Sequence, residues 1–177
     1  MKRVFDILFS ILILSVFLPF GIIISLLILL SSKGGIFYRQ ERIGRNRVPF
    51  YLLKFRTMRP SSDQSGKLTV GMRDPRITTI GYYLRKVKLD EFPQFINVLN
   101  GEMSIVGPRP EVAEFVDLYN EEQLKILEVK PGITDYASLH YFKENELLGK
   151  ASDPKATYIK DIMPEKLKLN AKYVEEV

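Results

Sequence analysis

The sequence predicts an α+β fold dominated by helices, with amphipathic surface helices, a small β-hairpin element and a long apolar helix at its N-terminus. Three observations support this prediction. Residues 7–30 contain no charged side chain, two β-prone stretches meet around Gly44, and helical spacing of apolar residues begins near Ile80. At 177 residues the chain is long enough for one buried core. We therefore expect a membrane helix over residues 1–32 and one membrane-associated domain over residues 33–177.

The composition limits the chemistry that the chain can carry. It contains no cysteine, which excludes disulfides, thiolate metal sites and a cysteine nucleophile. Its one histidine, His140, disfavours a histidine-based zinc site and a Ser-His-Asp triad. Acid–base or nucleophilic chemistry must therefore come from carboxylate, Lys, Tyr or Ser side chains.

The apolar segment is long enough to cross a bilayer, because a straight helix of this length would reach about 36 Å. A secretory signal peptide is disfavoured, since the apolar run is too long and no small-x-small cleavage site follows it. Lys2 and Arg3 precede the segment and a basic block follows it. The positive-inside rule therefore places both flanks on the cytoplasmic side.

Pro19 lies at the middle of this segment and removes a backbone donor, which kinks a helix. The Ser15 hydroxyl is in place to bond the backbone group that the proline frees. Two topologies satisfy the charged flanks. The helix either bends at Pro19 and returns to the same membrane face, or it crosses as a kinked span with the domain still cytoplasmic. Charge and proline alone do not separate these topologies.

Residues 33–59 are strongly basic, with eight cations against the single acid Glu41, although the whole chain has a net charge of +5. The cations are Lys33, Arg39, Arg42, Arg45, Arg47, Lys54, Arg56 and Arg59. Such a block after an apolar segment is typical of contact with anionic lipid head groups or phosphate ligands. Nucleic acid is the rival class of partner, but its zinc-finger, RNA-recognition and basic-zipper motifs are missing. We expect membrane lipids, and no nucleic acid, as partners.

The domain begins with two β-prone stretches, residues 35–44 and 48–58, joined around Gly44-Arg45-Asn46. They predict a hairpin or extended segments at the membrane surface. The following polar segment, residues 59–76, is rich in Gly and Ser and predicts a mobile loop.

Helical spacing then predicts one helical stretch over residues 80–99, with Gly101 just past its end. A second amphipathic helix is predicted over residues 111–128, and a last one from Pro164.

Two adjacent carboxylates, Asp90 and Glu91, stand out in the stretch "KLDEFPQF". The ordinary interpretation is the acidic start of a helix, because Pro93 is tolerated in a first turn and the helix dipole favours anions there. The same position also favours a bound phosphate. Side chains of neighbouring helical residues point about 100° apart, so the two carboxylates would divide two roles. One could attack phosphorus while the other holds a divalent cation.

That chemistry requires cations around the phosphates. Arg109 is stiffened by a proline on each side, so its guanidinium is presented with little loss of entropy. Each cation alone is better explained as a solvated surface residue, and only the group around the dyad favours phosphate binding. The candidates for phosphate binding are Lys54, Arg56, Arg85 and Arg109.

These motifs resemble those of the bacterial sugar transferases that act on polyprenyl phosphate, the monotopic phosphoglycosyl transferases. The matching pieces are "KRVFD", "YRQERIGRNRVPFYLLKFRTM", "LRKVKLDEFPQFINVLNGEMSIVGPRP" and "VKPGIT". They cover most of residues 1–134 in the order found in the family. The length of the chain is similar to that of the family's minimal catalytic core.

The resemblance implies a two-step, ping-pong reaction. Asp90 would attack the sugar-bearing phosphate of a UDP-sugar and release UMP, and polyprenyl (undecaprenyl) phosphate would then displace the aspartate. Glu91 would be the Mg²⁺ ligand, and Lys54, Arg85 and Arg109 fall at positions associated with phosphate binding. The resemblance also implies a re-entrant helix and a catalytic domain on the cytoplasmic face of the bacterial inner membrane. A second copy of the chain or glycosyltransferases of the same glycan pathway are further expected partners.

The chain departs from the family pattern in two places. The family breaks its helix at a Ser-Pro pair, whereas Leu18 precedes Pro19 here, so Ser15 would have to assist. After Thr134 the usual small apolar, Gln and Arg pattern is absent, so sugar and uridine contacts cannot be carried over. Residues 153–177 predict packing helices. Two alternatives stay open, a non-catalytic membrane-bound scaffold and a metal-dependent hydrolase of nucleotide sugars.

Overall fold

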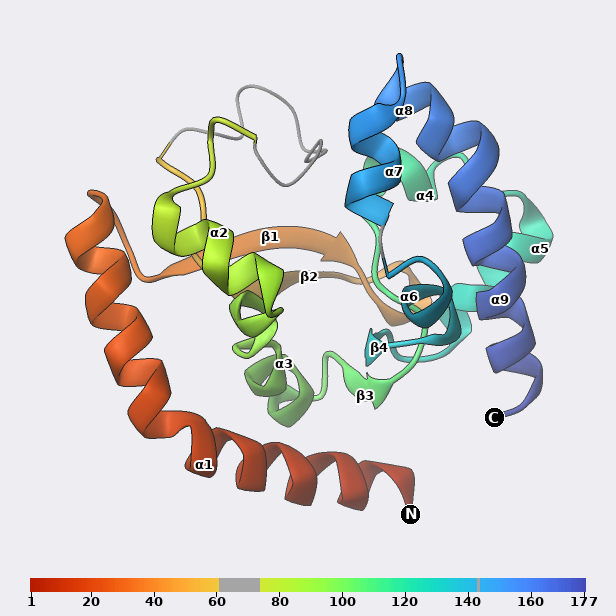
Figure 1. The fold of residues 1–177 in the computed structure, drawn as a ribbon. Coiled ribbons are helices and arrows are strands. Elements are labelled where there is room, and N and C mark those ends of the chain that lie inside the picture. Colours follow the sequence, from red (N-terminus) through yellow and green to blue (C-terminus); the bar gives the residue numbers. More distant parts are fainter. Residues whose placement is uncertain (61–73, 143) are drawn as a thin grey trace.

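The computed structural model describes residues 1–60, 74–142 and 144–177. Its architecture is helix-dominated α+β, as predicted (Figure 1). The helices are α1 (Lys2–Ser31), α2 (Thr79–Lys86), α3 (Gln94–Asn100), α4 (Ala113–Val116), α5 (Glu121–Leu124), α6 (Tyr136–His140), α7 (Glu144–Lys150), α8 (Pro154–Thr157) and α9 (Met163–Glu175). The strands are β1 (Phe37–Ile43), β2 (Pro49–Phe55), β3 (Ser104–Val106) and β4 (Gly132–Thr134).

Helix α1 is one continuous helix with Pro19 inside it, and Figure 1 shows it bent into two arms. The expected break is therefore a bend within the helix, the usual effect of an internal proline. The Ser15 side chain is exposed and makes no hydrogen bond within the described part of the chain. The structure thus gives Ser15 no part in satisfying the freed backbone.

The N-terminal arm of α1 is fixed to the domain by polar contacts. The Arg3 guanidinium donates to the carbonyls of Val98 and Leu99 at the end of α3, where a cation complements the helix dipole. Asp6 is buried and accepts from the Ser104 hydroxyl at 2.8 Å and from the Ile105 amide at 3.2 Å. The motif "KRVFD" therefore attaches the first arm to α3 and β3.

The second arm packs on the same domain. Ile24 and Ile28 form a buried cluster with Phe55 and Leu84, from β2 and α2. At the end of the arm, the Arg56 guanidinium donates to the carbonyls of Ser32 and Lys33 at 2.7 and 2.8 Å. Both ends of α1 are consequently held by one body.

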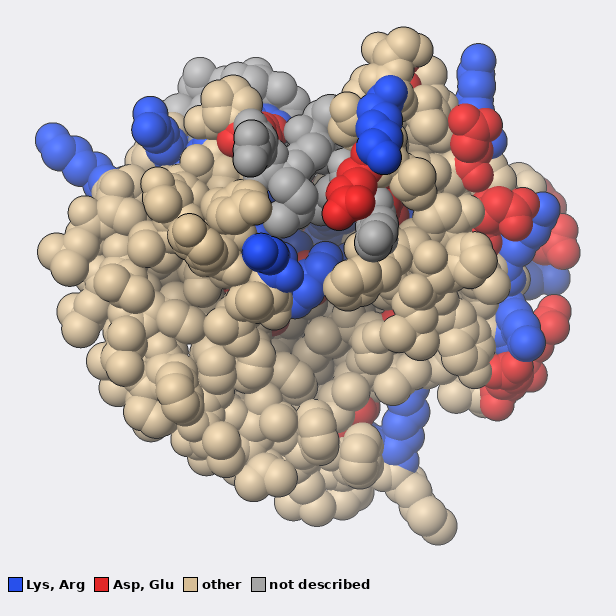
Figure 2. Space-filling model, viewed as in Figure 1, with Lys and Arg blue, Asp and Glu red and all other residues tan. Residues whose placement is uncertain are grey.

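The outer side of α1 is apolar. Lys2–Ser31 is long and apolar enough to cross a membrane, with a mean hydropathy of 2.9 over its best window, of which only 11% is buried. Figure 2 shows a wide area without charged side chains over this helix. Its exposed apolar side chains include Phe5, Leu8, Leu12, Val16, Phe20, Ile23, Leu26 and Leu30.

The predicted hairpin is confirmed. Strands β1 and β2 pair antiparallel, from Phe37 opposite Phe55 to Ile43 opposite Pro49. The connection is a 3-10 turn, Arg45–Arg47, in which Asn46 adopts the left-handed region that Asn tolerates.

A second, parallel pair, β3 and β4, was not predicted, because three-residue strands carry little periodicity. This pair brings Gly107 and Gly132 into close contact. A Cβ on Gly132 would lie 2.1 Å from the Gly107 nitrogen.

Two helix predictions were wrong in their extent. The stretch 80–99 is divided, because Lys88 adopts a left-handed conformation that ends the first helix before a 3-10 turn, Leu89–Glu91. The stretch 111–128 is also divided, because the Asn120 side chain caps a new short helix. Most of the predicted mobile loop, residues 61–73, lies outside the described residues.

The C-terminal helices pack as predicted. Together with residues from the segment after β3, they form the largest buried cluster among the described residues. Figure 1 places α7, α8 and α9 on the side of the hairpin opposite to the second arm of α1. The cluster comprises Val112, Phe115, Ile126, Leu148, Tyr158, Ile162, Met163 and Leu167.

Candidate active site

A cavity of about 630 Å³ lies between the hairpin, the α2–α3 connection and the C-terminal helices. Figure 2 shows a hollow near the centre of the molecule with Lys and Arg side chains in it. The cavity brings together the predicted site residues, which come from four separate segments of the chain. Its lining includes Lys54, Arg56, Arg85, Asp90, Glu91 and Arg109.

The dyad lies just before α3 and not within its first turn. Lys88 turns the chain, Asp90 and Glu91 occupy the 3-10 turn, and Pro93 leads into the helix. Phe92 stacks on Phe17 of α1, with ring centroids 3.6 Å apart. This contact ties the position of the dyad to the membrane helix.

Asp90 is buried without a complete set of partners. Its side chain belongs to a residue only 6% exposed, and Oδ1 has no hydrogen-bond partner among the described residues. Burial raises the pKa of Asp90, against the opposing effect of Lys54. A carboxylate oxygen that is neither solvated nor hydrogen-bonded retains a reactive lone pair, as a nucleophile requires.

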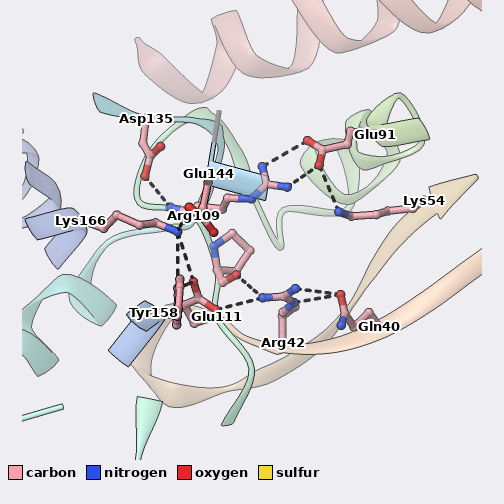
Figure 3. Close-up of polar contacts among 11 residues, drawn as sticks. Gln40, Arg42, Lys54, Glu91, Arg109, Glu111, Asp135, Glu144, Tyr158 and Lys166 are labelled. Atoms are coloured by element: carbon pink, nitrogen blue, oxygen red, sulfur yellow. Dashed lines mark hydrogen bonds and ion pairs between the residues drawn. The ribbon is translucent and has the colours of Figure 1, made fainter. Parts of the chain in front are cut away.

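Glu91 has the opposite environment. It accepts from the Lys54 ammonium at 3.1 Å and from both terminal nitrogens of Arg109, one of them at 3.2 Å (Figure 3). Burial alone would raise the pKa of Glu91, but Arg109 and Lys54 outweigh it and hold the pKa well below the ordinary value. Two adjacent carboxylates whose pKa values are pushed apart are suited to different roles.

Arg109 is held at both its backbone and its side chain. Its amide donates to Asp135 Oδ2 at 3.1 Å, and its Nη1 lies 3.4 Å from the Ile133 carbonyl. Asp135 also caps α6 by accepting from the Ser138 amide at 2.6 Å. The Pro-Arg-Pro turn is thus fixed by β4 and α6, and its guanidinium points at Glu91.

The other two predicted cations differ in orientation. Arg85 donates through Nε to the Thr57 hydroxyl at 2.9 Å and lines the cavity, and its charge acts on Asp90. Arg56 also lines the cavity, but its terminal nitrogens bond the carbonyls at the end of α1. Lys54, Arg85 and Arg109 therefore surround the dyad, whereas Arg56 joins α1 to the domain.

The dyad fits a divalent cation only in company with a ligand. In the described ranges there is no group of three acidic or histidine residues that could hold a metal ion. Mg²⁺ is commonly bound by one or two carboxylates together with substrate phosphates, so a full protein cage is not required. The unpartnered Asp90 Oδ1 and the adjacent Glu91 are the oxygens that such an ion would use.

Several cavity residues escaped the sequence prediction. Lys166 contacts Glu144 at 3.0 Å and Glu111 at 3.7 Å, and Arg42 contacts Glu111 at 3.2 Å (Figure 3). Tyr158 donates to Glu111. Arg42 belongs to the basic block and Glu111 follows the Pro-Arg-Pro turn, but neither has a local signal. Only the packing of the C-terminal helices brings this group together.

The family model described as bacterial sugar transferase matches residues 1–177. The chain belongs to the bacterial sugar transferase family. The resemblance of its motifs to this family is thereby confirmed.

Relatives carry more specific names. The Aeromonas hydrophila UDP-N-acetylgalactosamine-undecaprenyl-phosphate N-acetylgalactosaminephosphotransferase is 37% identical over 162 residues, which are 90% of this chain and 37% of that protein. The Escherichia coli (strain K12) UDP-glucose:undecaprenyl-phosphate glucose-1-phosphate transferase is 40% identical over 147 residues, 79% of this chain and 31% of the relative. The Rhizobium meliloti (strain 1021) exopolysaccharide production protein ExoY is 38% identical over 148 residues, which are 75% of this chain and 66% of that protein. The chain thus spans less than two thirds of these three relatives. The names of the first two specify different sugars, N-acetylgalactosamine and glucose.

Proposed function

We propose that this protein transfers a sugar 1-phosphate group from a UDP-sugar to polyprenyl phosphate, giving polyprenyl diphosphate-sugar and UMP. The observation that carries this proposal is the buried Asp90 carboxylate, with one oxygen unpartnered, among Lys54, Arg85 and Arg109. Undecaprenyl phosphate and a sugar phosphate appear in the names of two relatives, which supports the same reaction class.

In the first step, a carboxylate oxygen of Asp90 attacks the phosphorus that carries the sugar. A new P–O bond forms to Asp90, and the P–O bond to the UMP oxygen breaks with its electron pair leaving on UMP. In the structure, Lys54 and Arg109 form ion pairs with Glu91. The oxygens of a bound diphosphate would compete with Glu91 for these two cations. Lys54 and Arg109 can therefore stabilise the charge that develops on the leaving group.

In the second step, a phosphate oxygen of the polyprenyl phosphate attacks the same phosphorus. The bond to Asp90 breaks, and the carboxylate is regenerated. An acyl phosphate is energetic enough for this transfer to proceed readily. Asp90 is only 6% exposed, which would limit the access of water to the intermediate.

Glu91, together with Asp90, would hold Mg²⁺ beside the diphosphate. The ion supplies charge neutralisation at the phosphate oxygens. The pKa of Glu91 lies well below the ordinary value, so this carboxylate stays ionised and able to bind a cation at neutral pH.

The membrane helix suits this reaction, because the acceptor is a lipid. Both ends of α1 are bonded to the domain, through Arg3 and Asp6 at one end and Arg56 at the other. We propose that α1 is re-entrant, entering and leaving on the cytoplasmic face of the bacterial inner membrane. This topology would keep the dyad close to the lipid phosphates.

The test is to incubate the purified full chain with a panel of UDP-sugars and Mg²⁺, without an acceptor. We expect one equivalent of UMP and a phosphosugar adduct in the intact-protein mass spectrum, followed by turnover when polyprenyl phosphate is added. Asp90→Asn should abolish the adduct. Asp117→Asn, the same change at an exposed position, should leave it intact.

Other outcomes point to the alternatives. An adduct that persists in Asp90→Asn would refute this assignment of the nucleophile. Continuous UMP release without acceptor would indicate a hydrolase, and no release with any UDP-sugar would favour a scaffold. Addition of EDTA tests the metal, since the proposal requires loss of UMP release that Mg²⁺ restores.

A further inference from the structure

A second polar cluster lines the same cavity, away from the dyad. It consists of Arg42, Glu111, Glu144, Tyr158 and Lys166, and we call it the C-terminal cluster because three of its members follow residue 143. Lys166 joins two carboxylates, those of Glu144 and Glu111, and its ammonium lies 5.2 Å from the centre of the Tyr158 ring. Figure 3 shows the cluster converging around Lys166 and Glu111.

The charges in this cluster cancel. It contains two cations, Arg42 and Lys166, and two carboxylates, Glu111 and Glu144. Arg42 is fully engaged, since it also donates to Gln40 at 2.8 Å and to the Pro110 carbonyl at 3.0 Å. A balanced cluster with exposed acceptors gives a phosphate no net attraction, but it offers many hydrogen bonds to a neutral, hydroxylated group.

The side of the cavity around the dyad has the opposite character. There, Lys54, Arg85 and Arg109 exceed the carboxylates Asp90 and Glu91 in number, which suits the charged part of a ligand. The turn that carries Arg109 connects the two sides. Its guanidinium faces Glu91, while the next two residues, Pro110 and Glu111, face Arg42.

Among the four charged members of the cluster, Glu144 is the most exposed. Its side chain is 25% exposed, against 18% for Arg42, 13% for Glu111 and 10% for Lys166. Lys166 donates to Glu144 Oε2, and Oε1 makes no hydrogen bond within the described residues. Lys166 thus fixes the carboxylate through one oxygen, and the other oxygen of this cavity-lining residue can accept from a hydroxyl group.

We propose that the C-terminal cluster is the subsite for the sugar of the donor, and that Glu144 determines which hydroxyl configuration is accepted. This inference rests on the proposed function, because it assumes that the phosphates occupy the side of the dyad. The nucleoside is the other neutral part of the donor. The sugar is favoured because carboxylate acceptors match its several hydroxyl donors.

The test compares Glu144→Gln and Glu144→Asp with Glu146→Gln and Glu146→Asp, the same changes at an exposed position of the same helix. The donors are UDP-glucose, UDP-galactose and their 2-acetamido analogues, which differ at single positions of the sugar. We expect the Glu144 changes to shift the ratio of kcat/KM between epimers by about tenfold or more, because a bond to a charged group is lost or moved. The Glu146 variants should keep the ratio of the unaltered chain.

Ligand-observed saturation-transfer NMR on the full chain in detergent provides a second readout, independent of turnover. Sugar-proton signals should weaken in the Glu144 variants while uracil signals persist. Unchanged signals and ratios, or a loss confined to uracil, would overturn the subsite. If the unaltered chain contacts the sugar but releases no UMP, the proposed transfer fails while the subsite stands.

Discussion

At the scale of single residues, the site depends on two neighbouring carboxylates in unequal surroundings. Asp90 is buried with an unpartnered oxygen, which costs stability, whereas Glu91 is paired with two cations, which offsets part of that cost. The same contrast raises the pKa of Asp90 and lowers that of Glu91. The two carboxylates are neighbours in sequence. The different environment of Glu91 comes from Arg109 and Lys54, which lie 18 and 37 positions from it in the sequence.

The pH dependence of the first step follows from this contrast. The attack requires ionised Asp90, and burial raises its pKa above the ordinary value of 3.8. We therefore expect kcat/KM for the donor to fall on acidification, with the fall beginning at a higher pH than an ordinary aspartate would give. The measurement is UMP release as a function of pH.

A variant of Arg85 provides a second pH profile for comparison with that of the unaltered chain. Its charge lowers the pKa of Asp90, so Arg85→Gln should move the acid limb of kcat/KM to still higher pH. A limb at the ordinary aspartate value, or a shift to lower pH in Arg85→Gln, would contradict the role given to Asp90.

At the scale of elements, long-range polar contacts set the position of helix α1. Arg3 and Asp6 attach one arm, and Arg56 attaches the other. Phosphate binding was the prediction for Arg56, and no observation yet tests it. Its bonds to two backbone carbonyls give it a structural role in any case.

Arg56→Lys separates these roles. A lysine keeps the charge but cannot bond the carbonyls of Ser32 and Lys33 with a planar fork. We expect a loss of about 1–3 kcal/mol in stability, read as a lower Tm, with an unchanged KM for the donor. Arg39→Lys, at an exposed position of β1, is the matched control and should alter neither. A raised KM at unchanged Tm would instead support phosphate binding.

The β3–β4 pair makes a similar prediction. A Cβ at Gly132 would lie 2.1 Å from the Gly107 nitrogen and 2.4 Å from its oxygen, so Gly132→Ala must push the two strands apart. We expect the free energy of unfolding to fall by several kcal/mol. Because this strand pair orients the Pro-Arg-Pro turn, we also expect activity to be lost. Gly35→Ala is the control, since its Cβ would meet the nearest atom, the Phe37 oxygen, at 3.8 Å. Equal melting temperatures for the two variants would show that the strands can separate without cost.

At the scale of the whole molecule, the two arms of α1 and the domain form one body with an apolar outer side. Figure 1 shows the arms along two sides of the remaining chain. A straight span would have to release either the contacts of Arg3 and Asp6 or those of Arg56. The re-entrant topology keeps all of them.

Cysteine labelling tests this topology, and the natural chain contributes no background because it has no cysteine. One cysteine is inserted after Met1 and another replaces Lys33, whose side chain is exposed. In right-side-out vesicles, a membrane-impermeant maleimide should label neither position until the membrane is opened. Labelling of only one position before opening would mean that α1 crosses the membrane.

The sequence by itself determined the local features of this protein. The apolar helix, the hairpin around Asn46 and the dyad follow from patterns a few residues long, because propensity and hydrophobic spacing act over such distances. The family could also be inferred from motifs that cover most of residues 1–134. The interruptions of the predicted helices at Lys88 and Asn120 were not, because a turn conformation or a cap can override spacing.

Only the tertiary structure decided how those features meet. The ion pairs of Glu91, the attachment of α1 through Arg56, and the cluster around Lys166 all join residues far apart in sequence. No local pattern encodes such contacts, since they arise when separate elements pack around one cavity. The carboxylate pair was visible in the sequence, whereas its electrostatics and the proposed sugar subsite depend on the fold.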